Sequence, residues 1–281
     1  MSKKKLFLRI GIGLVAFLVL TAILLPSILQ WAGLHPKYEG ERYSFSDKRA
    51  LIITTSHGEL GDTGNRTGVY ASEMTIPYYE FSDSGIQVDV ASIRGSEIPI
   101  DPMSMRYPLI TPSDWRFRKD AEFQNKVINS LSIIEVDFSQ YDLILLTGGW
   151  GASYDFGNSE ILGERISEAY AHGVILGSVC HGALGFLQAR DTNGMPLIYG
   201  RRMTAVTNKQ VEELNISITP MHPETKLRQS GAEFESVSAF RDFFATHVVV
   251  DGLIVTGQNQ NSSAETANIM MRILNERHRQ Q

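Results

Sequence analysis

From residue 50 onward, short runs of apolar and often β-branched residues alternate with longer amphipathic stretches, a pattern that few architectures accept. The short runs predict strands at residues 50–55, 86–93, 141–147, 174–179, 202–206 and 248–255. The amphipathic stretches predict helices at residues 71–82, 120–131, 160–172, 182–189, 210–214 and 264–277. Strands that alternate with helices form a parallel sheet covered by helices on both faces. The sequence therefore predicts one α/β domain.

The N-terminal part of the chain has a different composition. Residues 10–34 carry no charge, and residues 13–25 are almost wholly apolar. About 20 apolar residues span the core of a bilayer, whereas a cleaved signal peptide has an apolar region of about 7–15. The sequence predicts a basic tail at residues 1–9, a transmembrane signal-anchor at 10–34, a linker at 35–47 and the α/β domain at 48–281. A cleaved signal peptide stays open as the alternative.

The basic residues beside the apolar segment bear on its orientation. Four of them precede the segment, and four more follow it by Arg49. Because the first four are crowded into nine residues, the positive-inside rule favours an N-terminus inside the cell. We therefore expect a single-pass membrane protein whose domain lies on the extracytoplasmic side.

Charge and cysteine content exclude several classes of protein. The formal net charge is -5 and no basic stripe interleaved with aromatics follows the N-terminal tail, so nucleic-acid binding is not expected. The single cysteine rules out an intramolecular disulfide and a cysteine-based metal cluster. Neither a metal site nor a cofactor is expected.

Three predicted strands end in loops of unusual composition. These loops are residues 56–68 after the first strand, 148–155 after the third and 180–182 after the fourth. In open α/β sheets the ligand crevice lies beyond the carboxyl ends of the strands. The lone cysteine, Cys180, lies in one of these loops. It is therefore a candidate nucleophile, and the alternative is a small buried residue without a chemical role.

The residues around Cys180 favour thiol chemistry. A cysteine between a buried strand and a helix start is exposed on a tight turn, and the N–H groups of the helix start favour the thiolate, so a lowered pKa is expected. Gly148 and Gly149 leave room for backbone N–H groups to face a developing oxyanion. His181 follows Cys180 directly, and Glu73 near a helix start is either a dipole-stabilised carboxylate or a buried proton relay.

Five stretches together resemble the ThiJ/PfpI superfamily, in its heat-shock-chaperone and glyoxalase III-like branch. They are residues 68–79, 99–104, 147–151, 178–182 and 250–259. The resemblance implies a flavodoxin-like fold, related to class-I glutamine amidotransferase domains, and a possible homodimer. It also implies that Cys180 is the nucleophile, that His181 is its neighbouring histidine and that Glu73 hydrogen-bonds the thiol. Gly149 and the His181 amide would be the oxyanion donors.

The sequence departs from that branch at two places. Trp150 follows Gly148 and Gly149 where the branch has a histidine. Val211 stands where the branch has an acid that orients the histidine beside the nucleophile. Glu212 is one position late and, on a helix, would point about 100° away. It remains a possible third acid, with His222 as a further possibility.

The favoured function is that of a cofactor-free enzyme that adds Cys180 to a small-molecule carbonyl substrate. The resemblance implies glyoxalase III or D-lactate dehydratase-like chemistry, in which methylglyoxal becomes D-lactate through a thiohemiacetal. Export would be unusual for such an enzyme, because methylglyoxal arises chiefly in the cytoplasm. A holdase chaperone or redox-sensing module is the first alternative, and a cysteine peptidase or amidase is the second. Glutamine amidotransfer is not favoured.

Overall fold

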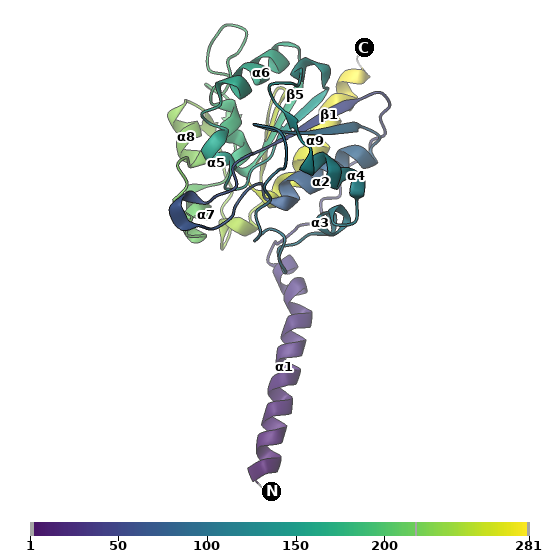
Figure 1. The fold of residues 1–281 in the computed structure, drawn as a ribbon, viewed down its shortest axis with the longest axis vertical. Helices are drawn as coiled ribbons and strands as arrows, with labels where there is room; N and C mark the ends of the chain where they lie inside the picture. The colour runs from purple at the N-terminus through teal and green to yellow at the C-terminus, as the bar shows by residue number, and fades with distance from the viewer. Residues whose placement is uncertain (1–2, 217, 280–281) are drawn as a thin grey trace. The chain divides into compact units, whose positions relative to one another are not determined.

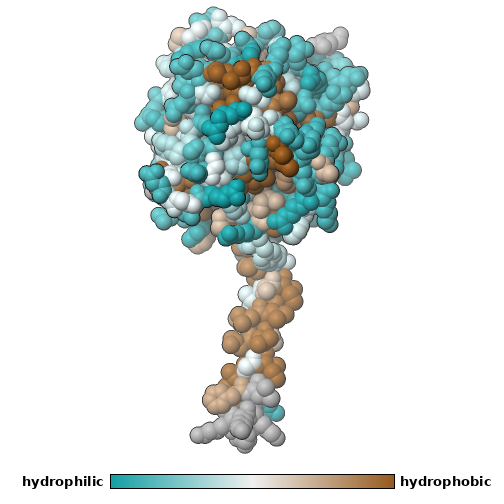
Figure 2. Space-filling model, in the orientation of Figure 1, coloured by the Kyte–Doolittle hydropathy of each residue, from teal (hydrophilic) through white to brown (hydrophobic). Residues whose placement is uncertain are grey.

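The structure is a computed structural model that describes residues 3–216 and 218–279. The chain forms two compact units, Met1–Pro36 and Lys37–Gln281. The first contains helix α1 (Lys3–Trp31), in which Arg9–Trp31 has a mean hydropathy of 2.6 and none of its most apolar stretch is buried. Figure 2 shows this helix as a brown rod, in contrast to the mostly teal surface of the second unit. Helix α1 is long and apolar enough to cross a membrane.

The second unit is built around a seven-stranded sheet with strand order β3-β2-β1-β4-β5-β9-β8. Its strands are β1 (Arg49–Thr54), β2 (Gln87–Ser92), β3 (Leu131–Ser132), β4 (Leu143–Leu146), β5 (Ile175–Val179), β8 (Val248–Asp251) and β9 (Ile254–Gly257). Strand β1 pairs with both β2 and β4 in parallel, so the direction of strand succession reverses between β1 and β4. Ligand crevices of open α/β sheets form at such a point.

Helices cover both faces of this sheet (Figure 1). One face packs against α2 (Ala71–Asp83), α4 (Ala121–Ile128) and α9 (Ser263–His278). The other packs against α6 (Glu160–Ala171), α8 (Pro223–Gln229) and the 3₁₀ helix η3 (Cys180–Phe186). The strands between them are almost wholly buried, which agrees with their continuous apolar sequences.

The remaining elements are short. They are helices α3 (Pro112–Phe117), α5 (Ala152–Asp155) and α7 (Asn208–Glu213), 3₁₀ helices η1 (Gly61–Thr63), η2 (Phe138–Gln140), η4 (Asp242–Phe244) and η5 (Gln260–Ser262), and the strands β6 (Arg202–Met203) and β7 (Glu233–Phe234). Strands β6 and β7 form a separate two-stranded sheet. The expected flavodoxin-like α/β fold is confirmed in its architecture.

Three details of the prediction are wrong. The sheet is mixed, because β8 is antiparallel to β9. The single strand predicted at residues 248–255 is the start of that hairpin, which turns at Gly252 with a positive φ of 60°. The helix predicted at residues 182–189 is instead the 3₁₀ helix η3, in which Gly182 packs against the Leu146 carbonyl group of β4 too closely for a Cβ.

Candidate active site

Cys180 lies directly after β5, on a sharp turn that leads into η3. Its φ is 59°, in the left-handed region that non-glycine residues seldom adopt. Such strain persists only where the surrounding structure enforces it, and it is common at nucleophile turns. The side chain is nevertheless buried, with 6% of the residue exposed. The turn therefore directs the thiol into a closed site and not into bulk water.

Glycines after β4 bring the backbone against this thiol. A Cβ on Gly148 would lie 2.6 Å from the Glu73 carboxyl and 2.8 Å from the Cys180 Cβ. Gly149 has a φ of 96°, and its N–H and that of His181 both hydrogen-bond Cys180. The predicted pair of oxyanion donors is thus directed at the Cys180 sulfur.

Glu73 reaches the thiol from the first turn of α2. Its Oε2 accepts a hydrogen bond of 2.9 Å from the Gly148 N–H, and the carboxyl also hydrogen-bonds the Cys180 thiol. Ser104 holds the start of this helix, because its Oγ accepts a 3.0 Å hydrogen bond from the Ala71 N–H. Residues 99–104, one of the stretches singled out in the sequence, thereby position Glu73.

Burial sets the protonation of this pair. It raises the pKa of Glu73 to about 8, although hydrogen bonds with Cys180 and Gly148 oppose the shift. Burial also raises the pKa of the Cys180 thiol, and the Glu73 charge adds to this effect. The prediction of a lowered thiol pKa is therefore wrong. The N–H donors stabilise the thiolate less than the water that burial removes would have done. Glu73 is mostly neutral at pH 7 and can exchange a proton with the sulfur.

His181 is fully buried beside the thiol. Its Nδ1 lies 3.4 Å from the Cys180 Sγ, and its Nε2 has no hydrogen-bond partner among the described residues. Burial lowers the pKa of His181 to about 3, and the proximity of His222 adds to the shift. The imidazole is therefore neutral at physiological pH.

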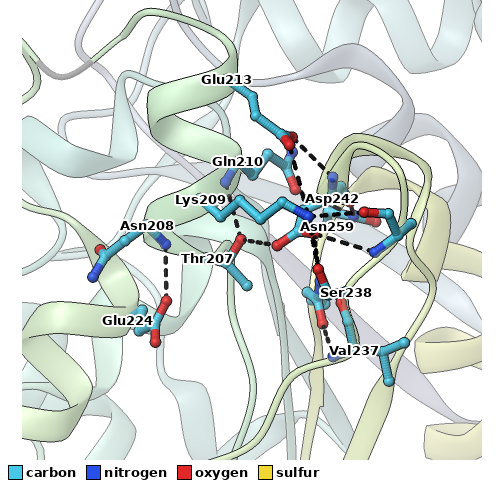
Figure 3. A network of polar contacts seen from close by, with 12 residues as sticks. Thr207, Asn208, Lys209, Gln210, Glu213, Glu224, Val237, Ser238, Asp242 and Asn259 are labelled. Atoms are coloured by element: carbon cyan, nitrogen blue, oxygen red, sulfur yellow. Dashed lines mark hydrogen bonds and ion pairs between the residues drawn. The ribbon is translucent and has the colours of Figure 1, made fainter.

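The possible third acid is not brought to this imidazole. Glu212 lies on α7 with an exposed side chain, whereas His181 is buried. The start of α7 belongs to a polar network around Asp242 (Figure 3). Lys209 donates a 2.9 Å hydrogen bond to the Asp242 carboxylate, and the N-cap residue Thr207 donates one of 2.7 Å. No acidic side chain hydrogen-bonds the His181 ring in the described part of the chain.

Two aromatic residues at the site were not predicted to have a role there. The Trp150 ring packs edge-on against the His181 ring, with centroids 5.0 Å apart. Tyr70 precedes α2, and its buried hydroxyl has no hydrogen-bond partner among the described residues. The charges of Glu73 and Cys180 are among the influences that raise its pKa, after burial. The unusual Trp150 was visible in the sequence, but its contact with His181 was not.

The comparison with family models matches residues 66–272 to the DJ-1/PfpI family. The chain belongs to the DJ-1/PfpI family. Within it, the chain is 26% identical over 242 residues to a glutathione-independent glyoxalase of Schizosaccharomyces pombe, covering 81% of this chain and 96% of the relative. The resemblance seen in the sequence is confirmed.

Two solved structures superpose on most of this chain. Glyoxalase III from Candida albicans superposes with a TM-score of 0.74 at 25% identity, covering 80% of this chain and 96% of the other. The Rapid Encystment Protein of 24 kDa from Francisella tularensis superposes with a TM-score of 0.75 at 31% identity, covering 80% and 98%. Both alignments extend over most of the α/β domain.

Proposed function

We propose that this chain is a cofactor-free glyoxalase of the glyoxalase III type, which converts a small 2-oxoaldehyde such as methylglyoxal to its 2-hydroxy acid. The observation that carries the proposal is the placement of Cys180 between the Glu73 carboxyl and two backbone N–H donors. Relatives named as glutathione-independent glyoxalases, which match about four fifths of the chain, support it.

Addition to the aldehyde begins with a proton transfer from the Cys180 sulfur to the Glu73 carboxylate. The sulfur then bonds the aldehyde carbon, and the electron pair of the C=O bond moves to its oxygen. The N–H groups of Gly149 and His181, which already reach the sulfur, stabilise that oxyanion. Glu73 then returns the proton to this oxygen, which gives a neutral thiohemiacetal on Cys180 and restores the carboxylate. Burial raises the pKa of Glu73 to about 8 and so makes it a stronger base than an exposed carboxylate, which suits it to this role.

The second half of the reaction moves hydrogen between two carbons of the adduct. Removal of the proton from the former aldehyde carbon and protonation of the neighbouring carbon give a thioester of the 2-hydroxy acid. Water then cleaves the thioester, which releases the acid and restores the thiol. One carbon is oxidised and the other reduced, so the sequence balances without an external oxidant. Glu73 and the neutral His181 are the proton carriers nearest the adduct.

The test is the turnover of methylglyoxal by the purified protein in the absence of glutathione, measured as lactate formed. Cys180→Ala should lower the rate at least about 10³-fold, because the covalent path is lost. Ser178→Ala is the matched control and should leave the rate unchanged, since Ser178 is buried in β5 and its hydroxyl has no hydrogen-bond partner among the described residues. Equal turnover by a folded Cys180→Ala protein would refute the proposal. Protection of unfolding clients that survives Cys180→Ala, without turnover, would favour the chaperone alternative.

We further propose that helix α1 anchors the enzyme in a membrane, with the α/β domain on the extracytoplasmic side. Support comes from the length and hydropathy of Arg9–Trp31 and from the basic residues crowded before it. The predicted boundaries at residues 9, 34 and 47 belong to this proposal, and a cleaved signal peptide is its alternative. The homodimer stays a prediction, and sedimentation analysis of the purified protein would test it.

A further inference from the structure

A surface around α3 combines exposed apolar residues with positive charge, and the proposed reaction does not use it. Met103, Tyr107 and Trp115 are 56%, 60% and 50% exposed. Arg106, Arg118 and Lys119 are also exposed, and we call these six residues the α3 face. Scattered exposed apolar residues are ordinary, but three large ones within thirteen positions beside basic residues mark an interaction surface.

The charge of this segment opposes that of the whole chain. Residues 103–119 contain four basic side chains and one acid, Asp114, in a chain with a net charge of -5. Asp114 is buried, where it caps α3 through Thr111 and accepts a 2.6 Å hydrogen bond from Thr75. Arg116 is paired with Asp83. The α3 face thus presents three positive charges and no exposed carboxylate of its own segment.

Contacts within the segment hold the α3 face together. The Arg118 guanidinium donates a 3.0 Å hydrogen bond to the Met105 carbonyl and lies 4.6 Å from the centre of the Trp115 ring. Arg106 reaches the sulfur of Met103 at 3.8 Å. The Trp115 ring and the Arg118 guanidinium are therefore in direct contact, and Arg106 lies against Met103 in the same segment.

The chain enters the α/β domain beside this face. Tyr38 and Arg42 line a surface pocket of about 790 Å³ together with Ser113 and Arg116 of α3. Tyr38 comes only seven positions after Trp31, the end of the apolar stretch. Seven extended residues span at most roughly 25 Å. If α1 crosses a bilayer, this short connection limits how far Tyr38 can lie from the membrane surface.

We propose that the α3 face docks on the headgroup layer of a bilayer that contains anionic lipid. Tryptophan and tyrosine favour the interfacial region of membranes, and basic side chains are attracted to anionic headgroups. The tether raises the effective concentration of this face at the membrane, so weak contacts suffice. This inference rests on the proposed membrane anchor and is independent of the proposed enzyme activity.

The test uses the full chain with Trp31→Phe and Trp150→Phe, which leave Trp115 as its single tryptophan. The protein is placed in nanodiscs of phosphatidylcholine with one-third phosphatidylglycerol, with and without a lipid that carries a nitroxide on its headgroup. Trp115 emission should shift to the blue and be quenched by the nitroxide. The matched control adds Tyr199→Trp to a variant that also carries Trp115→Phe, since Tyr199 is 64% exposed on a different loop, and should show little quenching.

Charge removal tests the lipid specificity. Arg106→Ala and Lys119→Ala should each lower the ratio of docked to free protein about fivefold. High salt should also lower this ratio, because it screens the attraction between basic side chains and anionic headgroups. Quenching of Trp115 no greater than that of the Tyr199→Trp control would overturn the docking, and quenching that ignores phosphatidylglycerol would overturn the role of anionic lipid. A chain that does not enter the nanodiscs would overturn both the anchor and the docking. Lactate formation, measured separately, tests only the enzyme proposal.

Discussion

Burial of Cys180 and Glu73 raises the pKa of both side chains, which disfavours the thiolate but makes the Glu73 carboxylate a stronger base. A buried thiolate loses water, which raises the pKa of the thiol. The same burial raises the pKa of Glu73 to about 8 and so makes its carboxylate a stronger base than an exposed one. The N–H groups of Gly149 and His181 then stabilise negative charge in a site from which water is excluded.

This account predicts a pH-dependent effect of Glu73→Gln on stability. Between pH 4.5 and about 8 the folded protein keeps a proton on Glu73 that the unfolded chain has lost. The free energy of unfolding should therefore fall through this window by up to about 1.4 kcal/mol per pH unit from this group. The Gln variant lacks this slope, so it should gain stability relative to the wild type as pH rises. Urea unfolding at several pH values measures the difference.

Glu212→Gln serves as the control for that experiment, because Glu212 is an exposed carboxylate. Its stability should follow that of the wild-type protein at every pH. Parallel stability curves for the Glu73→Gln and wild-type proteins would mean that Glu73 is not held neutral by burial.

The sequence was informative about single residues wherever local pattern determines position. Cys180, His181 and the Gly148–Gly149 turn follow directly from strand ends, and the structure brings them together with Glu73. The protonation of Cys180 was not predictable, because it depends on burial between elements distant in sequence. The contact between Trp150 and His181 depends in the same way on the packing of two separate loops.

Among the elements, α7 shows how a network outside the site fixes local structure. Asp242 is buried, and this would raise its pKa, but hydrogen bonds from Lys209, Thr207 and Ser238 outweigh burial and lower it. The Asn259 side chain also binds the Asp242 carbonyl at 2.8 Å. The network joins the start of α7 to the segment before β8 (Figure 3).

We predict that Asp242→Asn lowers the free energy of unfolding by about 2–4 kcal/mol, because it removes the charge that accepts from two hydroxyl groups and leaves Lys209 with the more distant Glu213 as its charged partner. Thermal or urea unfolding measures the loss. Glu212→Gln on the same helix should change stability by less than about 0.5 kcal/mol. An Asp242→Asn protein as stable as the control would show that the network contributes nothing to folding.

Element type was predictable for long periodic segments and less so for short ones. The helices at residues 71–82, 160–172 and 264–277 are found within one residue of their predicted ends. Helices α3, α5 and α8 were missed because four to seven residues hold too little periodicity. The hairpin of β8 and β9 was taken for one strand because a single glycine interrupts an apolar run.

For the whole molecule, the fold class followed from alternation, but the order of strands in the sheet did not. Strand order depends on which strands pair, and pairing joins residues that are far apart in the chain. The convergence of the loops after β1, β4 and β5 was expected, because parallel strands end at one edge. The observed order places these three strands side by side, which assembles the site.

The central claim, that the Cys180–Glu73 pair adds to a carbonyl substrate, is tested most directly by the pH dependence of kcat/KM for methylglyoxal. The account predicts that kcat/KM rises with pH, with a midpoint near 8, as the pair loses its first proton and Glu73 becomes a base. Glu73→Gln should abolish this rise and leave a low rate. A profile that is flat across this range, or a Glu73→Gln protein with the wild-type rate and profile, would contradict the account.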